Sequence, residues 1–202
     1  MNKYQIGCDE VGLGSIAGPL VVAAVVLQDD LVIKGVRDSK KIPPHRRLNL
    51  VHDIAREALY WVIARSDADV VDRFGVKSCL SNLMKECVVS CLEHFPEAEV
   101  VVDGVNPVPG VPASIQRAVV RADDKFQTVG AASIIAKVYR DRLMVQMAAL
   151  YPIYEFHRNM GYPSKVHKTQ LNKHGPCIEH RRSYAPVKKV MQKLGLCLER
   201  PM

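Results

Sequence analysis

Apolar runs alternate with amphipathic segments along the first third of the chain. The first run, over residues 3–9, has apolar side chains at positions 4, 6 and 8, and the second, over residues 20–27, is apolar throughout. Runs that are apolar at nearly every position are typical of strands buried on both faces of a sheet. We predict strands over both runs, a short third strand over residues 31–34 and a further strand over residues 60–64.

Helical periodicity marks the segments around these strands. Two prolines introduce a predicted helix over residues 44–59, and apolar residues at helical spacing predict a core-facing helix over residues 76–94. Ser66 and Asp69 have the spacing of a capping box, so a helix should begin there and break at Gly75.

The second half of the chain continues the alternation of strands and helices. Its longest helical pattern is rich in alanine, and small residues along one face would allow close packing against a sheet. Strands alternating with helices predict an α/β fold, with a central sheet flanked by helices. The elements predicted here are strands over residues 99–103 and 115–120, and helices over residues 128–150, 164–173 and 187–194.

Length and composition favour one domain. A chain of 202 residues with 48% apolar content can bury a substantial core. We expect residues 1–150 to form the α/β core and residues 151–202 to form a small basic helical region packed on the same domain.

Positive charge is concentrated near the C-terminus. Residues 151–202 contain ten Lys or Arg and three acidic residues, whereas residues 1–150 contain eighteen of each. Clustered cations release counterions from a phosphate backbone, but a solvated basic surface that maintains solubility explains the charge equally well. Tyr162 and Tyr184 lie among these cations and favour nucleic acid as the partner.

The cysteines and the hydropathy pattern indicate a cellular setting. The six cysteines form no C-x-x-C pair and are typical of small apolar residues in a reducing compartment. No stretch approaches the roughly 20 apolar residues that span a membrane, and the N-terminus has no long apolar leader. We therefore expect a cytoplasmic monomer without membrane association.

Acidic residues at strand ends are the strongest chemical signal. Asp9 and Glu10 end the first strand, glycines at positions 12, 14 and 18 follow, and Asp103 ends a later strand. With one of Asp123 or Asp124, these residues would form four carboxylates at one edge of a sheet. A single acid after a strand is more often a turn or cap residue, so convergence in space is a hypothesis.

Such a cluster would require cations. Carboxylates held close together repel one another unless positive charge neutralises them. Oxygen ligands suit Mg²⁺ or Mn²⁺, whereas the Cys and His ligands of zinc do not assemble in this sequence, and the seven histidines show no ligand spacing. Two divalent ions about 4 Å apart can catalyse phosphodiester hydrolysis, so the pattern favours a metal-dependent phosphodiesterase.

Several short motifs then occur in a fixed order between residues 4 and 188. They occupy residues 7–19, 38–41, 102–104, 122–125, 132–137, 140–141, 160–162 and 180–187. In sequence and in order they resemble the type 2 ribonuclease H family, ribonuclease HII. The resemblance implies a ribonuclease H-like α/β fold, with a central mixed β-sheet and a small helical C-terminal region.

The resemblance also implies an activity. It implies an endonuclease that hydrolyses the RNA strand of RNA–DNA hybrids and cuts 5′ of ribonucleotides embedded in duplex DNA. A two-metal mechanism with Mg²⁺ or Mn²⁺ would leave 5′-phosphate and 3′-hydroxyl ends. By position, the catalytic and metal-binding acids of the family fall on Asp9, Glu10, Asp103 and Asp123. Asp124 is the alternative fourth acid, because Ala122 replaces the glycine of the family's G-D-x-K pattern.

The resemblance also implies that a second set of residues recognises the ribonucleotide. The family's G-R-G loop falls on Gly12, Leu13 and Gly14, and its later tyrosine falls on Tyr162. Backbone groups beside glycine can approach a 2′-hydroxyl, which distinguishes RNA from DNA. Leu13 replaces an arginine that would offer charge and several donors, so we expect weaker junction preference or lower affinity.

Basic residues in two motifs are candidate phosphate ligands. Lys40 and Lys41 lie in the motif of residues 38–41, where an ordinary exposed turn is the alternative. Arg181 and Arg182 have the same two interpretations, and one of them could instead hold the C-terminal loop against the body. Two other functions remain open: a hybrid nuclease of the same fold without junction preference, and a non-catalytic hybrid-binding module.

Overall fold

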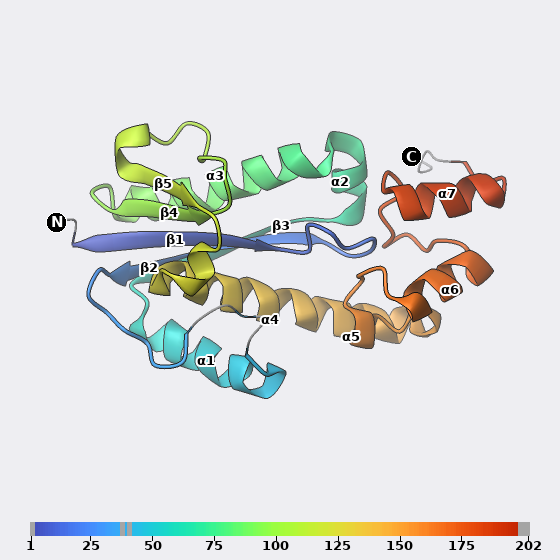
Figure 1. Cartoon of the computed structure of the whole chain (residues 1–202), viewed down its shortest axis with the longest axis horizontal. Coiled ribbons are helices and arrows are strands. Elements are labelled where there is room, and N and C mark those ends of the chain that lie inside the picture. The colour runs from blue at the N-terminus through green and yellow to red at the C-terminus, as the bar shows by residue number, and fades with distance from the viewer. Residues whose placement is uncertain (1–2, 37–38, 40–41, 198–202) are drawn as a thin grey trace. The chain divides into compact units, whose positions relative to one another are not determined.

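A mixed β-sheet is the central element of the computed structural model, which describes residues 3–36, 39 and 42–197. Within these residues the sheet has five strands in the order β3-β2-β1-β4-β5 (Figure 1). Strand β1 is antiparallel to β2 and parallel to β4, which is parallel to β5. The strands are β1 (Tyr4–Val11), β2 (Leu20–Gln28), β3 (Tyr60–Ser66), β4 (Glu99–Asp103) and β5 (Gln116–Val119).

Helices follow or separate these strands, as the alternation in the sequence predicts. The α-helices are α1 (Pro44–Glu57), α2 (Ala68–Phe74), α3 (Val76–His94), α4 (Gln127–Leu150), α5 (Phe156–Asn159), α6 (Lys165–His174) and α7 (Ala185–Lys193). Short 3-10 helices are η2 (Ala113–Ile115), η3 (Ala122–Asp124) and η4 (Pro152–Tyr154). The predicted α/β fold with a central mixed sheet flanked by helices is confirmed.

The chain forms two compact units. The first unit consists of Met1–Val11, Val21–Arg65 and Leu80–Val138, and the second consists of Gly12–Leu20, Ser66–Cys79 and Tyr139–Met202. The second unit therefore combines the expected C-terminal helical region with two earlier segments.

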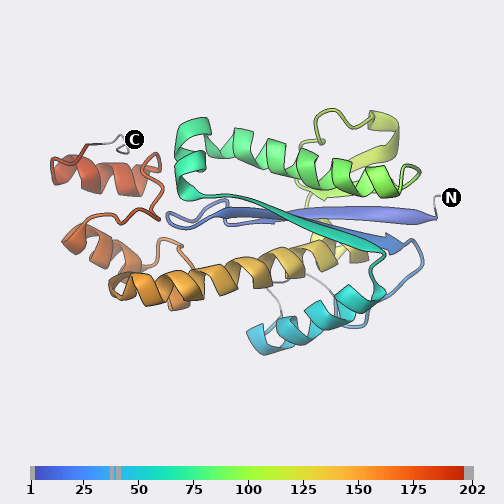
Figure 2. The same cartoon turned by 180° about the vertical axis from the view of Figure 1, so that it is seen from behind.

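Two consecutive residues of β1 show how helices cover the sheet in the first unit. A Cβ atom on Gly7 would lie 2.1 Å from the carbonyl carbon of Thr128, so only glycine allows the first turn of α4 to pack this closely. The next residue, Cys8, is buried near Cys87 and Cys91 of α3, and burial with these thiols raises its pKa. Helices α4 and α3 therefore cover opposite faces of the sheet (Figure 1, Figure 2).

Two apolar clusters organise the second unit around the segment that follows β1. Ile16 is buried against Leu171 of α6 and three residues of α7, which are Val187, Val190 and Met191. Its neighbour Ala17 is buried against Met144 of α4 and Phe156 of α5 in a second cluster. Both clusters hold the glycine-rich segment in place.

Three details of the predicted secondary structure were wrong. Residues 31–34 form no strand, and Val32 is 74% exposed, because this short apolar run has no neighbouring strand to pair with. Helix α2 has Asp67 at its N-cap, so Ser66 ends β3 and forms no capping box. Asp9 and Glu10 lie within β1, which extends to Val11.

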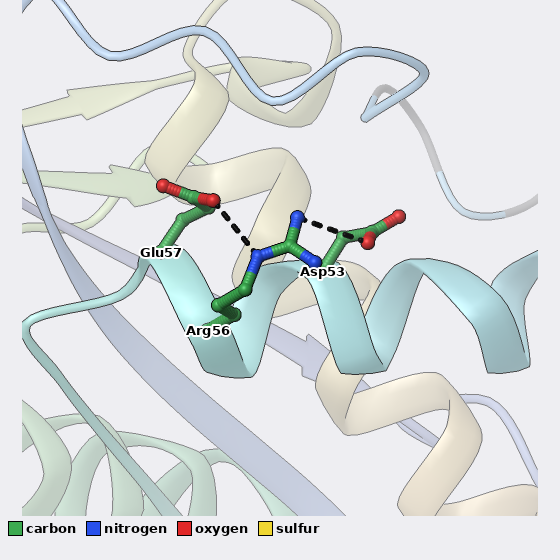
Figure 3. A network of polar contacts seen from close by, with 3 residues as sticks. All are labelled: Asp53, Arg56 and Glu57. Atoms are coloured by element: carbon green, nitrogen blue, oxygen red, sulfur yellow. Dashed lines mark hydrogen bonds and ion pairs between the residues drawn. The ribbon is translucent and has the colours of Figure 1, made fainter.

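The surface of α1 carries a small ionic network (Figure 3). The Nε atom of Arg56 lies 3.0 Å from Oε1 of Glu57, and its Nη2 atom lies 3.3 Å from Oδ1 of Asp53. These side chains are exposed, so we expect them to contribute little to stability. No helix in the described part of the chain is both long and apolar enough to cross a membrane.

Candidate metal site and nucleic-acid-binding segments

Three carboxylates converge in the first unit. Asp9, Glu10 and Asp103 each offer an oxygen, and these oxygens all lie within 4.8 Å of one another. The pairing of β1 with β4 explains this arrangement, because Cys8 lies opposite Val102 in parallel register. Asp9 and Asp103 are the next residues of the two strands, so the parallel register brings both acids to the same position along the sheet.

Asp9 is the most buried member of this cluster and is 4% exposed. Its Oδ1 atom accepts the backbone N–H of Glu10 at 2.7 Å, and its carboxylate also has a hydrogen bond with Ser133 of α4. Burial, together with the charges of Glu10 and Asp103, raises the pKa of Asp9 well above its usual range, although the two hydrogen bonds oppose this shift.

Asp103 connects the cluster to the turn that follows β5. Its Oδ1 atom accepts the backbone N–H of Ala122 at 2.7 Å, at the start of η3. The same turn presents Asp123 and Asp124, of which Asp123 is buried and Asp124 is exposed, 3.8 Å from a guanidinium nitrogen of Arg121. Neither Asp123 nor Asp124 belongs to the group of three acids whose oxygens lie within 4.8 Å of one another. Of the two, Asp123 is the better candidate for a fourth acid, because it is buried and follows Ala122, whose N–H donates to Asp103.

The chemistry of this donor set fits a divalent cation. Carboxylate oxygens alone suit Mg²⁺ or Mn²⁺ better than zinc or copper. The raised pKa of Asp9 reflects negative charge crowded in a partly desolvated place, and a bound cation would relieve that repulsion. The cluster therefore fits the metal site that the sequence predicts.

The glycine-rich segment after β1 lies in the second unit, where a buried arginine supports it. Arg140 of α4 donates to the backbone oxygens of Pro19 and Ala17 and to the hydroxyl of Ser15. Gly12 has a φ of +94°, and a Cβ atom at this position would lie 2.4 Å from Nε of Arg140. Glycine is therefore required at this position by both the backbone and the packing.

A second buried arginine, Arg181, also holds this segment. Its Nε atom donates to the oxygen of Gly18 at 3.0 Å, and its Nη1 atom donates to the oxygen of Gly12 at 2.7 Å. The Tyr184 hydroxyl donates to the backbone oxygen of Leu13 at 2.7 Å. Since Arg181 is fully buried, these contacts match the predicted alternative in which one of the two arginines holds a loop.

The two buried guanidinium groups influence each other. Burial, together with the nearby Arg181 charge, lowers the pKa of Arg140 to about 10, and Tyr162 opposes this shift. Burial also lowers the pKa of Arg181. Backbone carbonyl oxygens accept most of their hydrogen bonds, so the arginines stabilise the conformation of the segment through its backbone.

The remaining predicted substrate residues differ in their surroundings. Tyr162 is half-buried, with its ring 5.5 Å from the guanidinium carbon of Arg140. The backbone N–H of Arg182 donates to Asp72 at 2.9 Å, which connects the C-terminal loop to α2. The Leu13 side chain is 40% exposed, and Lys40 and Lys41 lie outside the described residues.

The sequence predicted that Asp9, Glu10 and Asp103 would lie close together, but it did not point to two residues that support these segments. Ser133 contacts Asp9, and Arg140 supports the glycine-rich segment. Both residues belong to motifs noted in the sequence, but neither their spacing nor their residue type predicts these contacts. Ser133 and Arg140 are far from these partners in the sequence, and only the fold brings them together.

The mixed sheet, its flanking helices and the three converging carboxylates define a ribonuclease H-like α/β protein with a candidate divalent-metal site. Solved structures agree on the fold. Ribonuclease H2 from Pyrococcus horikoshii superposes with a TM-score of 0.75 at 24% identity, covering 95% of this chain and 99% of that chain. The ribonuclease HIII called Bst-RNase HIII, solved in complex with Mn²⁺, gives a TM-score of 0.75 at 18% identity, covering 95% and 70% of the two chains.

Sequence comparisons define the family. The model of the family Ribonuclease HII matches residues 6–187. Ribonuclease HII of Idiomarina loihiensis is 43% identical over 190 residues, which cover 93% of this chain and 98% of the relative. Ribonuclease HII of Thiobacillus denitrificans is 40% identical, over 94% of this chain and 91% of the relative. The chain belongs to the ribonuclease HII family and is an enzyme, a ribonuclease H, and this membership supports endonuclease activity on RNA–DNA hybrids.

Proposed function

We propose that this enzyme also cuts 5′ of ribonucleotides embedded in duplex DNA, in addition to the RNA strand of continuous RNA–DNA hybrids. The convergence of Asp9, Glu10 and Asp103 carries the catalytic part of this proposal. The braced glycine-rich segment and Tyr162 support recognition of the ribonucleotide, in the positions that the family resemblance assigns to this role.

The acids would hold two divalent ions, Mg²⁺ or Mn²⁺. Asp9, Glu10 and Asp103 supply a clustered set of oxygens, and Asp123 is the proposed fourth ligand. Bound ions would supply a deprotonated water at neutral pH and neutralise charge on the phosphate. The Glu10 N–H and the Ser133 hydroxyl orient the Asp9 carboxylate, and the Ala122 N–H orients Asp103. No side chain is required as a general base, and we expect 5′-phosphate and 3′-hydroxyl products.

Recognition would use the backbone more than side-chain charge. Gly12 and Gly14 allow backbone groups to approach a 2′-hydroxyl, and the Tyr162 ring would stack on the adjoining sugar. Leu13 has no charge to offer to a phosphate, so the segment would lack the cationic contact that the family's arginine provides. It would recognise the ribonucleotide through the shape of its backbone. We propose that Arg181 contributes through the segment it holds, because its own side chain is buried.

Phosphate contacts elsewhere would supply affinity. We propose that Lys40, Lys41 and Arg182 contact the phosphate backbone, together with the basic residues of the C-terminal region. Such contacts position the duplex without reading its sequence, so their loss should weaken binding to every substrate by a similar factor.

Cleavage of two labelled duplexes, first with Mg²⁺ and then with Mn²⁺, tests this function. One duplex carries a single ribonucleotide in DNA, and the other pairs a continuous RNA strand with DNA. The control is Asp9→Asn, which should remove activity on both. Cutting 5′ of the lone ribonucleotide supports the proposal, and a product with a 2′,3′-cyclic phosphate would contradict the mechanism.

Leu13 favours a second candidate, a hybrid nuclease without junction preference. Cutting of the continuous hybrid alone would establish that function. Metal-independent binding without cutting of either duplex would instead indicate a non-catalytic binding module.

A further inference from the structure

A pair of buried histidines lies in the second unit. His167 of α6 and His180 are both fully buried. Their Nε2 atoms lie 3.0 Å apart, which is hydrogen-bonding distance. Two histidines cannot form this contact unless one ring donates a proton and the other accepts it.

Backbone partners determine which ring donates. The backbone N–H of Cys177 donates to Nδ1 of His180 at 3.1 Å, and the Cys177 thiol, 3.2 Å from the same nitrogen, can donate to it as well. Because a backbone N–H can only donate, Nδ1 is the acceptor and the proton of His180 lies on Nε2. His180 Nε2–H then donates to Nε2 of His167. The proton of His167 therefore lies on Nδ1, where it donates to the backbone oxygen of Tyr162 at 2.8 Å.

This chain of hydrogen bonds has one consistent arrangement. A second proton on His180 would lie on Nδ1 and face the N–H of Cys177, and a second proton on His167 would lie on Nε2 and face the N–H of His180. Both rings are therefore neutral in this geometry. Burial also lowers the pKa of His167. The rings of Tyr154 and Phe156 pack around the pair, and Cys177 and Glu179 are the nearby titratable groups on the segment of His180.

The pair joins two segments that the proposed function uses. Ala17 of the glycine-rich segment forms a β-bridge with His180. Hydrogen bonds on either side of that bridge run from Arg181 N–H to the Ile16 oxygen and from Gly18 N–H to the Glu179 oxygen. The side chains of the pair then continue from this bridge to the Tyr162 backbone.

Apart from the bond to His167, the Tyr162 backbone is hydrogen-bonded to residues close to it in the chain. Its oxygen accepts from His167 and from the N–H of Ser164, and its own N–H donates to the oxygen of Asn159. The preceding residue, Gly161, accepts hydrogen bonds from Ile16 and Ala17. The histidine pair is therefore a second connection, through side chains, between the glycine-rich segment and the tyrosine.

We propose that His167 and His180 are positioning residues, which fix Tyr162 relative to the glycine-rich segment for recognition of the ribonucleotide. This inference rests on the proposed role of Tyr162. The proposal gives the pair no part in metal binding or in the chemical step, so its loss should change substrate preference more than turnover of continuous hybrid.

Two amide substitutions at one position separate the two hydrogen bonds of His167. His167→Asn keeps an N–H near the Nδ1 position and can still donate to Tyr162, whereas His167→Gln places its amide near the Nε2 position and loses that donor. Cleavage of the single-ribonucleotide duplex should fall by about 2- to 10-fold in His167→Gln, as expected for one hydrogen bond, and by less in His167→Asn. Activity on the continuous hybrid serves as the internal reference for folding and metal binding.

Outcomes for these variants are distinguishable from failure of the proposed function. Equal loss on both duplexes in both variants, or no loss in either, would overturn the positioning role. The Tyr162→Ala variant should lose single-ribonucleotide cleavage, and adding His167→Gln to it should cause no further loss. If Tyr162→Ala alone has no effect, the recognition role of Tyr162 fails; if only the histidine variants have no effect, the inference alone fails.

The proton positions can be checked in the unmodified protein. Nitrogen-15 NMR of the histidine rings should show His180 protonated on Nε2 and His167 protonated on Nδ1 at neutral pH. The opposite tautomer of either ring, or a doubly protonated ring, would contradict the proposal without the use of any variant.

Discussion

The hydroxyl oxygens of Ser39 and Ser133 lie 2.9 Å apart, and Ser133 also has a hydrogen bond with the carboxylate of Asp9. Ser39 belongs to the motif of residues 38–41, and Arg47 donates to its backbone oxygen at 2.9 Å. A buried chain of hydrogen bonds thus connects α1 to the most buried acid of the candidate metal site.

Removal of the Ser133 hydroxyl should weaken metal binding. In Ser133→Ala, Asp9 loses the donor that orients its carboxylate, and residues of this kind typically change metal affinity by about 10- to 100-fold. Titration of Mn²⁺ by calorimetry measures this change directly. The exposed Ser114→Ala variant is the matched control and should retain the affinity of the unmodified protein. Unchanged affinity in Ser133→Ala would show that the hydroxyl does not orient Asp9.

Asp9→Asn should abolish cleavage and stabilise the metal-free protein. The folded-state pKa of Asp9 is raised above its unfolded value, so the stability contribution of this group falls as the pH rises through the folded pKa. Asparagine removes that cost, and a gain of about 1 kcal/mol would raise the melting temperature by about 2–4 °C in a domain of this size.

Thermal unfolding in EDTA and in Mg²⁺ at several pH values checks this prediction. The gain should shrink as the pH falls, because a protonated Asp9 resembles asparagine, and Mg²⁺ should stabilise the unmodified protein more than the variant. Asp53→Asn on the exposed surface of α1 is the control. A lower melting temperature for metal-free Asp9→Asn would contradict the proposed charge crowding.

The identity of the fourth acid can be tested with two neighbouring substitutions. Asp123 is buried beside the Ala122 to Asp103 hydrogen bond, whereas Asp124 is exposed. We expect Asp123→Asn to reduce cleavage by about 100-fold or more and Asp124→Asn to reduce it by less than about 3-fold, since only a metal ligand should be this sensitive. Steady-state cleavage rates in Mg²⁺ measure both, and the reverse order would assign the role to Asp124.

Hydrophobic periodicity was sufficient to predict most of the fold. The apolar run of β2 and the helical spacing of α3 and α4 extend over whole elements, so burial dominates local preference there. Residues 31–34 were misassigned because a strand also needs a neighbour, and pairing is not visible in one sequence. The Asp67 N-cap was missed because several short polar residues adjoin it and each could cap the helix.

Only the part of the candidate site that lies on paired strands was predictable from the sequence. Asp9, Glu10 and Asp103 converge because their strands are adjacent and parallel. The contacts of Ser133, Arg140 and His167 depend on tertiary packing between segments that are far apart in the chain, and residue type alone does not reveal them. The role proposed for the two buried histidines rests on their hydrogen bonds, which neither residue type nor spacing reveals.

The segment around Leu13 allows a direct test of what an arginine would add. Arg181 and Tyr184 hold the backbone oxygens of Gly12 and Leu13, so the backbone should tolerate substitution, and the exposed side chain has room for a longer one. Leu13→Arg should bind duplex substrates more tightly. Each new phosphate contact should steepen the dependence of log affinity on log salt by about 0.9.

Charge alone must be separated from placement. Ile153→Arg adds the same charge at another exposed apolar position of the second unit and is the matched control. If the segment recognises the junction, Leu13→Arg should raise the preference for the single-ribonucleotide duplex several-fold, whereas Ile153→Arg should change affinity for both duplexes by a similar factor. Equal effects of the two variants would show that the leucine does not limit recognition of the junction.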